Sequence, residues 1–149
     1  MWYYKDKVIT SKEYDEHVSK GVIGFVYCIT DLSNGMKYIG KKLWVSVRRL
    51  PPLKGQKRKR KKIVETDWKK YYGSSEQVKL LVEELGPENF KREILYLCTM
   101  KGEMTYLEAK EQFARDVLLK PDEYYNKFIG CKLHAKHVAI LMNKVVDIN

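Results

Sequence analysis

The chain has 149 residues, 44% of them hydrophobic and 12% aromatic, which supports one compact domain with a core but not two. Its 29 lysines and arginines outnumber the 19 aspartates and glutamates and give a net charge of +10, so the protein should attract polyanions. No stretch has the roughly 20 apolar residues that cross a bilayer, and residues 1–7 lack a signal peptide's apolar segment. We therefore expect a cytoplasmic protein without a membrane partner.

The three cysteines, Cys28, Cys98 and Cys131, are odd in number and far apart. This spacing argues against a disulfide framework and against a Cys-x-x-Cys zinc site. Cys28 and Cys98 occur in apolar, strand-like runs, so we expect them to be reduced thiols in the core.

The first element in chain order is a short helix over residues 11–20. Thr10 and Glu13 have the spacing of a capping box, and Gly21 follows as a stop signal. Residues 22–30 are rich in β-branched and aromatic side chains, and a second apolar run, 36–40, follows an Asn-Gly turn signal. These two runs predict a β-hairpin.

Residues 53–62 differ in kind, because cations surround one glycine and nothing there can be buried. Such a block predicts a solvated, mobile loop. It lacks the continuous apolar face of a membrane-binding segment, so a nucleic-acid backbone is the favoured ligand. The residues expected to contact that backbone are Lys54, Lys57, Arg58, Lys59, Arg60, Lys61 and Lys62. Trp44 and Trp68 flank the block and are expected to be core anchors.

Three more elements follow the basic block. A cap-like start at residues 74–77 and apolar residues at helical spacing predict a helix that Gly86-Pro87 ends. Residues 90–98 alternate in the manner of a strand. Residues 103–118 predict another helix, with a buried stripe of Leu107, Ala114, Val117 and Leu118. Residues 133–146 could form a last helix.

The element order predicts an α+β fold with a small three-stranded antiparallel sheet flanked by helices. We divide the chain into a helical appendage over residues 1–21, a main domain over 22–130 and a tail over 131–149. The main domain carries a basic insertion at 45–70, and we expect the tail to be helical. The sequence does not indicate the oligomeric state.

Two short motifs connect the hairpin to a known family. Gly24-Phe25-Val26-Tyr27 precedes Tyr38-Ile39-Gly40, with the two tyrosines eleven residues apart. The pair resembles the half-motifs that name the GIY-YIG nucleases, although Val26 replaces the usual isoleucine and Gly24 lies one place further from its tyrosine. Small phage-encoded, homing-type members are the most similar. Taken alone, the tyrosines could simply be packing residues of two strands.

The resemblance extends to a phosphate-binding position. In the family, an arginine just beyond the second half-motif contacts the scissile phosphate, and Arg48, with Arg49 beside it, occupies that place here. Lys41 and Lys42 are secondary candidates for the same task. The alternative is that both arginines merely extend the basic block. The long insertion makes this part of the family pattern align poorly.

Two further family positions lie late in the chain. Family members bind a divalent cation through one helical glutamate; Glu108 is the preferred match, and Glu111, three residues on, is the alternate. They also end their core with a Tyr-Asn pair near the active site, which Tyr125-Asn126 resembles. A turn-forming asparagine is the alternative explanation for Asn126.

The resemblance implies an endonuclease that hydrolyses DNA with Mg²⁺ or Mn²⁺. In this interpretation Tyr27 positions or deprotonates the attacking water, and Tyr38 orients the phosphate or the water network. The interpretation requires the glutamate and the tyrosine to converge on one phosphodiester from the same side of the sheet. The alternative is a non-catalytic nucleic-acid-binding protein that reuses the fold.

Overall fold

The computed structural model describes residues 1–142. Its strands are β1 (Trp2–Tyr4), β2 (Lys7–Val8), β3 (Gly24–Asp31), β4 (Lys37–Leu43), β5 (Val45–Leu50), β6 (Arg60–Glu65) and β7 (Phe90–Cys98). Its helices are α1 (Ser11–Ser19), α2 (Glu76–Leu85) and α3 (Lys101–Ala114). Short 3₁₀ turns occur at Trp68–Lys70, Pro87–Asn89, Val117–Leu119, Ala135–His137 and Ala139–Leu141. The predicted hairpin, the first two helices and the strand over 90–98 are confirmed.

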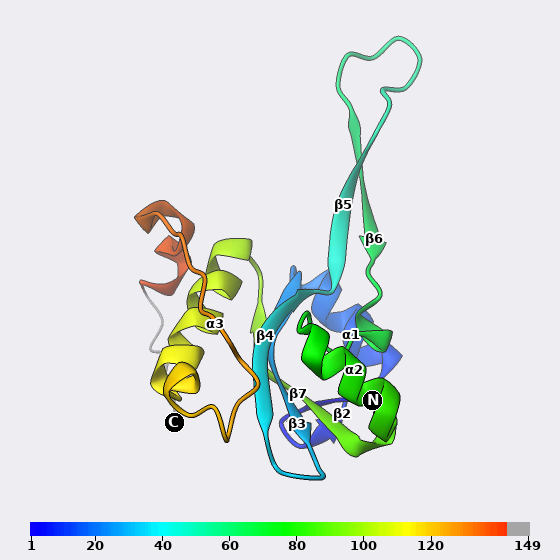
Figure 1. The fold of residues 1–149 in the computed structure, drawn as a ribbon. Coiled ribbons are helices and arrows are strands. Elements are labelled where there is room, and N and C mark those ends of the chain that lie inside the picture. Colours follow the sequence, from blue (N-terminus) through cyan, green and yellow to red (C-terminus); the bar gives the residue numbers. More distant parts are fainter. Residues whose placement is uncertain (143–149) are drawn as a thin grey trace.

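The central sheet has five strands in the order β2-β1-β7-β3-β4 and is mixed (Figure 1). Strand β3 pairs antiparallel with β4 and β7, whereas β1 runs parallel to β7. The α+β class is therefore confirmed, but the expected three-stranded antiparallel sheet is wrong. Strands β1 and β2 have three and two residues, too few for a period-two pattern to be detectable in the sequence.

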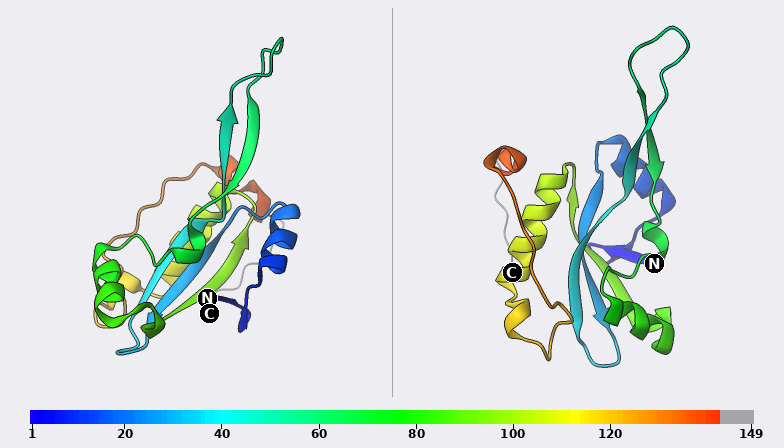
Figure 2. Two further views of the ribbon diagram at one scale, coloured as in Figure 1. Left: turned by 90° about the vertical axis from the view of Figure 1, so that its right-hand side faces the viewer. Right: turned by 45° about the horizontal axis from the view of Figure 1, so that its top comes forward.

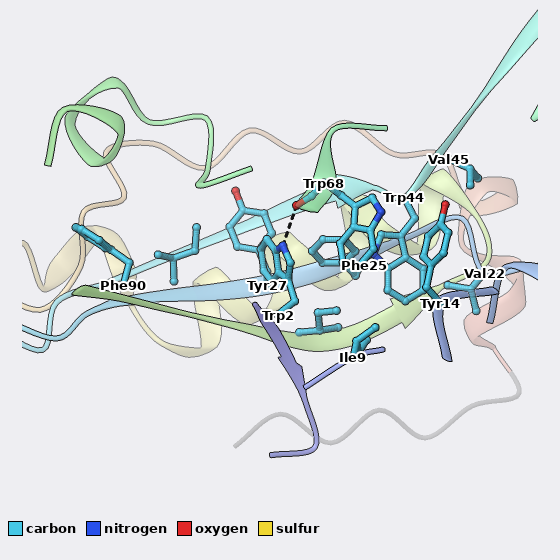
Figure 3. Packing of buried hydrophobic residues seen from close by; sticks show 12 residues of the cluster. Trp2, Ile9, Tyr14, Val22, Phe25, Tyr27, Trp44, Val45, Trp68 and Phe90 are labelled. Atoms are coloured by element: carbon cyan, nitrogen blue, oxygen red, sulfur yellow. Dashed lines mark hydrogen bonds between the residues drawn. The ribbon is translucent and has the colours of Figure 1, made fainter. Parts of the chain in front are cut away.

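The segment expected as a helical appendage thus also supplies two strands to the sheet. Within it, helix α1 begins as predicted, because the Thr10 side chain accepts a hydrogen bond from the Glu13 backbone N–H at 3.1 Å. Trp2 of β1 is buried, and its indole N–H donates to the Trp68 backbone oxygen at 2.8 Å (Figure 3). Strand β1 is therefore part of the core, whereas both residues of β2 are exposed.

Helices cover both faces of the sheet, with α1 and α2 on one face and α3 on the other (Figures 1 and 2). The core on the α1 and α2 face is largely aromatic, and Trp44 and Trp68 are buried in it, as expected (Figure 3). The core on the α3 face contains the buried thiols Cys28 and Cys98, which form no disulfide. The two cores fix α1, α2 and α3 relative to the strands between them.

The third helix ends earlier than predicted. Its last residue is Ala114, and Asp116 then adopts the left-handed conformation with φ of 52°. Because the chain leaves the helix there, Ala114 and Leu118 are exposed, contrary to the predicted buried stripe, whereas Leu107 and Val117 are buried. The boundary could not be read from the sequence, because no glycine marks it.

The predicted helix over 133–146 is wrong for its described part, which contains only two 3₁₀ turns; residues 143–146 lie outside the described residues. The first turn is closed by two histidines, because His134 Nδ1 accepts from the Lys136 N–H and His137 Nδ1 accepts from the His134 N–H. No helix within residues 1–142 is long and apolar enough to span a membrane.

The basic block is not entirely a loop. Residues 60–62 belong to β6, which pairs antiparallel with β5 to form a two-stranded ribbon separate from the main sheet. The ribbon stands out from the domain, with residues 51–59 as its exposed tip (Figures 1 and 2). The prediction of a loop over 53–62 is therefore wrong in its second part, because cross-strand backbone pairing outweighs the absence of a buried face.

Candidate active site

A cleft of about 750 Å³ opens beside β4, the edge strand of the sheet. Four parts of the chain form its walls: β4, the segment that leads into α2, one side of α3 and the segment after Tyr124. Its lining residues include Tyr38, Lys41, Tyr71, Ser74, Glu108 and Asn126. Four of these six are residues that the sequence had singled out.

Tyr38 and Lys41 both come from β4 but point to opposite faces of the sheet, because they are three residues apart on one strand. Tyr38 lies on the aromatic face, and its hydroxyl is 3.0 Å from Ser74 Oγ. Lys41 lies on the α3 face, where its ammonium donates to Thr105 Oγ1 at 2.8 Å. Burial raises the pKa of Tyr38, so its phenol stays protonated at neutral pH.

Glu108 approaches the same strand from α3. Its Oε1 is 3.9 Å from Lys41 Nζ, and its side chain is mostly buried. Burial raises the pKa of Glu108, while the charge and the backbone of Lys41 oppose that rise. A carboxylate in this position is stabilised by any further cation that enters the cleft.

Tyr38 belongs to the aromatic face of the sheet and Glu108 to the α3 face, so the expected convergence of phenol and glutamate from one side of the sheet is wrong. Both nevertheless line a single cleft, because β4 is the edge strand and the cleft wraps around its open edge. Their electrostatic coupling agrees with this closeness, since the Glu108 charge contributes to raising the Tyr38 pKa after burial. A bound phosphodiester would have to cross the strand edge.

Asn126 binds the backbone of β4. Its Oδ1 accepts from the Ile39 N–H at 3.0 Å, and its Nδ2 donates to the Ile39 carbonyl at 2.9 Å. Gln112, one helical turn after Glu108, donates to the same carbonyl at 3.1 Å. Together they satisfy the outward-facing backbone groups of Ile39 and fix the strand between Tyr38 and Lys41.

A buried carboxylate holds the segment that carries Asn126. Asp31 is 1% exposed and accepts a hydrogen bond from the Tyr125 hydroxyl at 2.7 Å. It also accepts from Ser33 and Asn89. Burial alone would raise the pKa of Asp31, but these hydrogen bonds outweigh it and lower the pKa. The turn after β3 and the end of the cleft wall are thus joined at one residue.

Tyr27 lies beneath the cleft and does not line it. It is the cross-strand neighbour of Gly40, is fully buried, and packs against Tyr71 with ring centroids 5.9 Å apart. Its hydroxyl has no hydrogen-bond partner within residues 1–142. Burial, followed by the neighbouring phenols Tyr71 and Tyr38, raises the pKa of Tyr27 well above its ordinary value. The structure thus brings Tyr38, but not Tyr27, to the cleft surface.

Glu111 points away from the cleft. Its carboxylate forms an ion pair with Arg115 at 2.7 Å and accepts from the Tyr96 hydroxyl at 3.0 Å. Glu111 is 3% exposed, so these partners occupy it in the core. Of the two candidate metal ligands, Glu108 is the one that lines the cleft.

Arg48 and Arg49 lie on β5, exposed, and neither lines the cleft. Arg48 is paired with Lys62 of β6, so it belongs to the basic ribbon, as the alternative interpretation held. The ribbon also carries the other basic residues expected to bind nucleic acid, at its tip and along β6. Lys42 is already engaged, because its ammonium binds Asp67 at 2.6 Å and lies over the Tyr71 ring.

Several lining residues were missed by the sequence analysis. Tyr71 and Ser74 come from the segment that leads into α2, Gln77 lies in the first turn of α2, and Lys127 follows Asn126. The cap-like start of α2 was visible in the sequence, and Ser75 does cap the helix by accepting from the Val78 N–H. What the sequence could not reveal is that this helix N-terminus faces the cleft.

The cleft's donor set fits a hydrated divalent cation. No group of three or more histidine, cysteine, aspartate or glutamate side chains gathers as a metal site within residues 1–142. Glu108 is the carboxylate of the cleft that faces Lys41, and it is partly shielded from solvent. Mg²⁺ is commonly bound through one or two carboxylates and retains several waters, with substrate phosphates as further ligands.

Residues 2–129 match a family model described as "Putative endonuclease segE, GIY-YIG domain". The match covers most of the chain, so the protein belongs to this family of GIY-YIG endonuclease domains, and the resemblance read from the half-motifs is confirmed. The class is thus a nuclease domain with DNA as the implied substrate. Searches among curated proteins and among solved structures found no match.

Proposed function

We propose that the chain is a divalent-metal-dependent DNA endonuclease and that it cleaves the phosphodiester in the cleft around the β4 edge. The observation that carries the proposal is that Tyr38, Lys41 and Glu108 line one cleft in a member of an endonuclease family. We propose further that the protein is related in function to small phage-encoded, homing-type enzymes. We also propose that it acts in the cytoplasm of the cell.

Two cations of the cleft support phosphate binding. Lys41 and Lys127 line it beside the carboxylates Glu76 and Glu108, and the N-terminal residues of the ten-residue helix α2, where backbone N–H groups favour an anion, line it as well. Because Arg48 lies outside the cleft, we assign to Lys41 the task of neutralising the phosphate. An ammonium acts as a point charge, without the paired geometry of a guanidinium.

Glu108 is the residue that would hold Mg²⁺ or Mn²⁺. When bound, such a cation supplies charge stabilisation to the phosphoryl and leaving oxygens. The charge of Lys41 opposes the rise that burial causes in the Glu108 pKa and so favours the ionised carboxylate that a metal ligand requires. Gln112 and Asn126 hold the adjoining strand still, so that the carboxylate and the phenol keep their separation.

Tyr38 is the phenol that we propose contacts the substrate. Its raised pKa keeps the proton on oxygen, so its role is to hydrogen-bond and orient the attacking water rather than to act as a phenolate. Ser74 fixes the direction of its hydroxyl. Tyr27 takes a positioning role beneath Gly40. Hydrolysis would leave a 5′ phosphate and, once the departing oxygen is protonated, a 3′ hydroxyl.

The rival function is a non-catalytic DNA-binding protein with the same fold. Incubation of supercoiled plasmid with purified protein distinguishes the enzyme from the non-catalytic protein. Only the enzyme nicks or linearises the plasmid in the presence of Mg²⁺, and a chelator should stop that cleavage. We expect cleavage, and we expect Tyr38→Phe to slow it by about a hundredfold, since the water loses its orienting group.

Tyr106→Phe is the matched control, because Tyr106 is a half-exposed tyrosine of α3 that does not line the cleft. It should cleave at the wild-type rate. Thermal melting of both variants establishes that each is folded. Intact plasmid with folded wild-type protein and Mg²⁺ would favour the rival, and equal rates for the two variants would remove Tyr38 from the site.

A further inference from the structure

The ribbon of β5 and β6 carries the densest positive charge of the described chain. Its cations, tip included, are Arg48, Arg49, Lys54, Lys57, Arg58, Lys59, Arg60, Lys61 and Lys62. None of these nine forms an ion pair with another part of residues 1–142. The ribbon also stands clear of the helices in every view (Figures 1 and 2). Its charge is therefore available to an external anion.

The strand register places like charges directly opposite each other. Arg48 pairs with Lys62, and Arg49 pairs with Lys61. Directly opposed residues share a face, and neighbouring residues alternate, so one cationic pair lies on each face of the ribbon. Opposed like charges repel, and the ribbon is most stable when an anion lies along both faces at once. A flat anionic surface could satisfy only one face.

One face also carries an exposed apolar pair. Val47 and Ile63 are cross-strand partners and are 58% and 63% exposed. By alternation they share a face with Arg49 and Lys61. A ligand that meets this face therefore offers both anionic and apolar contacts, as do the phosphates, sugars and thymine methyl groups of a DNA groove.

The width of the ribbon fits one of the two grooves of duplex DNA. Two paired strands lie about 4.8 Å apart, and with side chains they fill the roughly 12 Å width of the B-DNA major groove, which admits a two-stranded ribbon. The minor groove is only about 6 Å wide. The major groove of double-stranded RNA is too deep and narrow to be entered.

The root of the ribbon is rigid and continuous with the cleft. Trp44, the single residue between β4 and β5, is fully buried, and its carbonyl accepts from the Thr66 N–H on the returning side. Strand β4 carries Lys41, so the cleft and the ribbon lie along one line of chain. The seven residue steps from Lys41 to Arg48 span at most about 23 Å, or roughly seven base pairs of B-DNA.

We infer that the β5–β6 ribbon enters the major groove of duplex DNA, on one side of the cut and within one helical turn of it. The inference rests on the proposed function, because it takes DNA as the substrate of the cleft. The cations of the two faces contact the phosphates on the two groove walls, and the Val47 and Ile63 pair, which shares a face with Arg49 and Lys61, contacts the sugars and bases along that wall. The tip turn is formed by Leu53, whose carbonyl accepts from the Gln56 N–H, and by Gly55 with φ of 84°.

Methylation interference tests the groove. Dimethyl sulfate modifies guanine N7 in the major groove and adenine N3 in the minor groove, so one reagent reports on both. Binding of wild-type protein to a duplex of about three helical turns is measured with a chelator, so that no cleavage is needed. We expect guanine N7 methylation to block binding over a short stretch. Interference from adenine N3 alone, or from neither, would overturn the inference.

Paired variants test the ribbon. Arg48→Gln with Lys62→Gln removes one cationic pair, and Lys12→Gln with Lys20→Gln removes the same charge from exposed positions at the two ends of α1. The ribbon variant should weaken binding and lower the slope of affinity against salt by about 2, because two phosphate contacts are lost. The control variant should retain the wild-type slope. Equal slopes for both variants would contradict the inference.

The outcome is separable from the proposed function. Cleavage that depends on Tyr38 but no major-groove interference would refute the ribbon inference alone. Major-groove interference without any cleavage would refute the catalytic proposal and leave the ribbon as a DNA-binding element. Duplex RNA bound as tightly as duplex DNA would also refute the ribbon inference, since the ribbon cannot enter its major groove.

Discussion

At position 40 the hairpin tolerates only a hydrogen atom as a side chain. A Cβ added to Gly40 would overlap the hydroxyl and ring of Tyr27, the residue opposite it on β3. The second half-motif thus ends in glycine because the tyrosine of the first half-motif lies against that backbone. The two half-motifs form one packed unit, so the residue types of one half-motif depend on those of the other.

Asp31 illustrates a residue whose role is stability at the end of the cleft wall. Hydrogen bonds from Ser33, Tyr125 and Asn89 outweigh burial and hold its pKa below the ordinary value. A lowered folded-state pKa means that the stabilisation is present above the unfolded-state pKa of about 3.9 and is lost as the pH falls through the folded value. Asp31→Asn should therefore destabilise the protein at neutral pH by about 1–3 kcal/mol.

Urea unfolding at neutral and at acidic pH measures this effect. The wild type should lose more stability on acidification than Asp31→Asn, because the variant has no carboxylate to protonate at this position. Asp122→Asn, at an exposed aspartate, should behave like the wild type. If Asp31→Asn loses as much stability in acid as the wild type, the carboxylate is not what joins the turn to Tyr125.

The motif residues were predictable because chemical type and order along the chain are properties of the sequence. Tyr38, Lys41, Glu108 and Asn126 were all singled out, and all four line the cleft. Tyr27 and Arg48 were singled out on the same grounds and do not line it. The position of Arg48 depends on where β4 ends and the ribbon begins, which no local pattern encodes.

At the scale of elements, the edge of β4 is closed by side chains at Ile39, whereas at Lys37 it is closed by backbone hydrogen bonds to Glu123 and Tyr125. Asn126 is the acceptor of the Ile39 N–H, whereas both Asn126 and Gln112 donate to the Ile39 carbonyl. Asn126→Ala should therefore leave the buried Ile39 N–H without an acceptor and lower the free energy of unfolding by about 1–3 kcal/mol. Gln112→Ala leaves both Ile39 groups with a partner and should cost less.

Amide hydrogen exchange of Ile39 distinguishes the two variants directly. Its N–H should exchange faster in Asn126→Ala than in the wild type and nearly unchanged in Gln112→Ala. Equal protection in both variants would mean that Asn126 does not hold the strand edge. In that case its place in the cleft wall would need a different explanation.

Elements with clear periodicity were predicted well, and short or charged ones were not. The strand over 90–98 and the first two helices follow their apolar spacing and caps. Strands β1 and β2 are too short to show a period, and their place in the sheet depends on Trp2 reaching Trp68, 66 residues away. The charged strand β6 has no buried face to reveal it.

For the whole molecule, the proposed functions of cleft and ribbon would make them a single DNA-binding edge. Strand β4 lines the cleft and leads into β5 of the ribbon through the buried Trp44, which keeps their separation constant. The net charge of +10 is concentrated on the ribbon, away from the mostly buried Glu108, so binding and chemistry are assigned to different parts of the same edge. The chemistry depends on a fold that brings Glu108 of α3 beside β4, the strand that carries Tyr38.

The most direct test of this account compares two glutamates of one helix. Single-turnover nicking of plasmid with Mg²⁺ is measured for Glu108→Gln and for Glu111→Gln, with melting curves to correct for the folded fraction. We predict that Glu108→Gln loses about a thousandfold in rate, since a bound cation supplies several kcal/mol, yet still binds DNA in chelator. Glu111→Gln should cleave nearly normally once folded. Normal cleavage by Glu108→Gln, with loss in Glu111→Gln, would contradict the account.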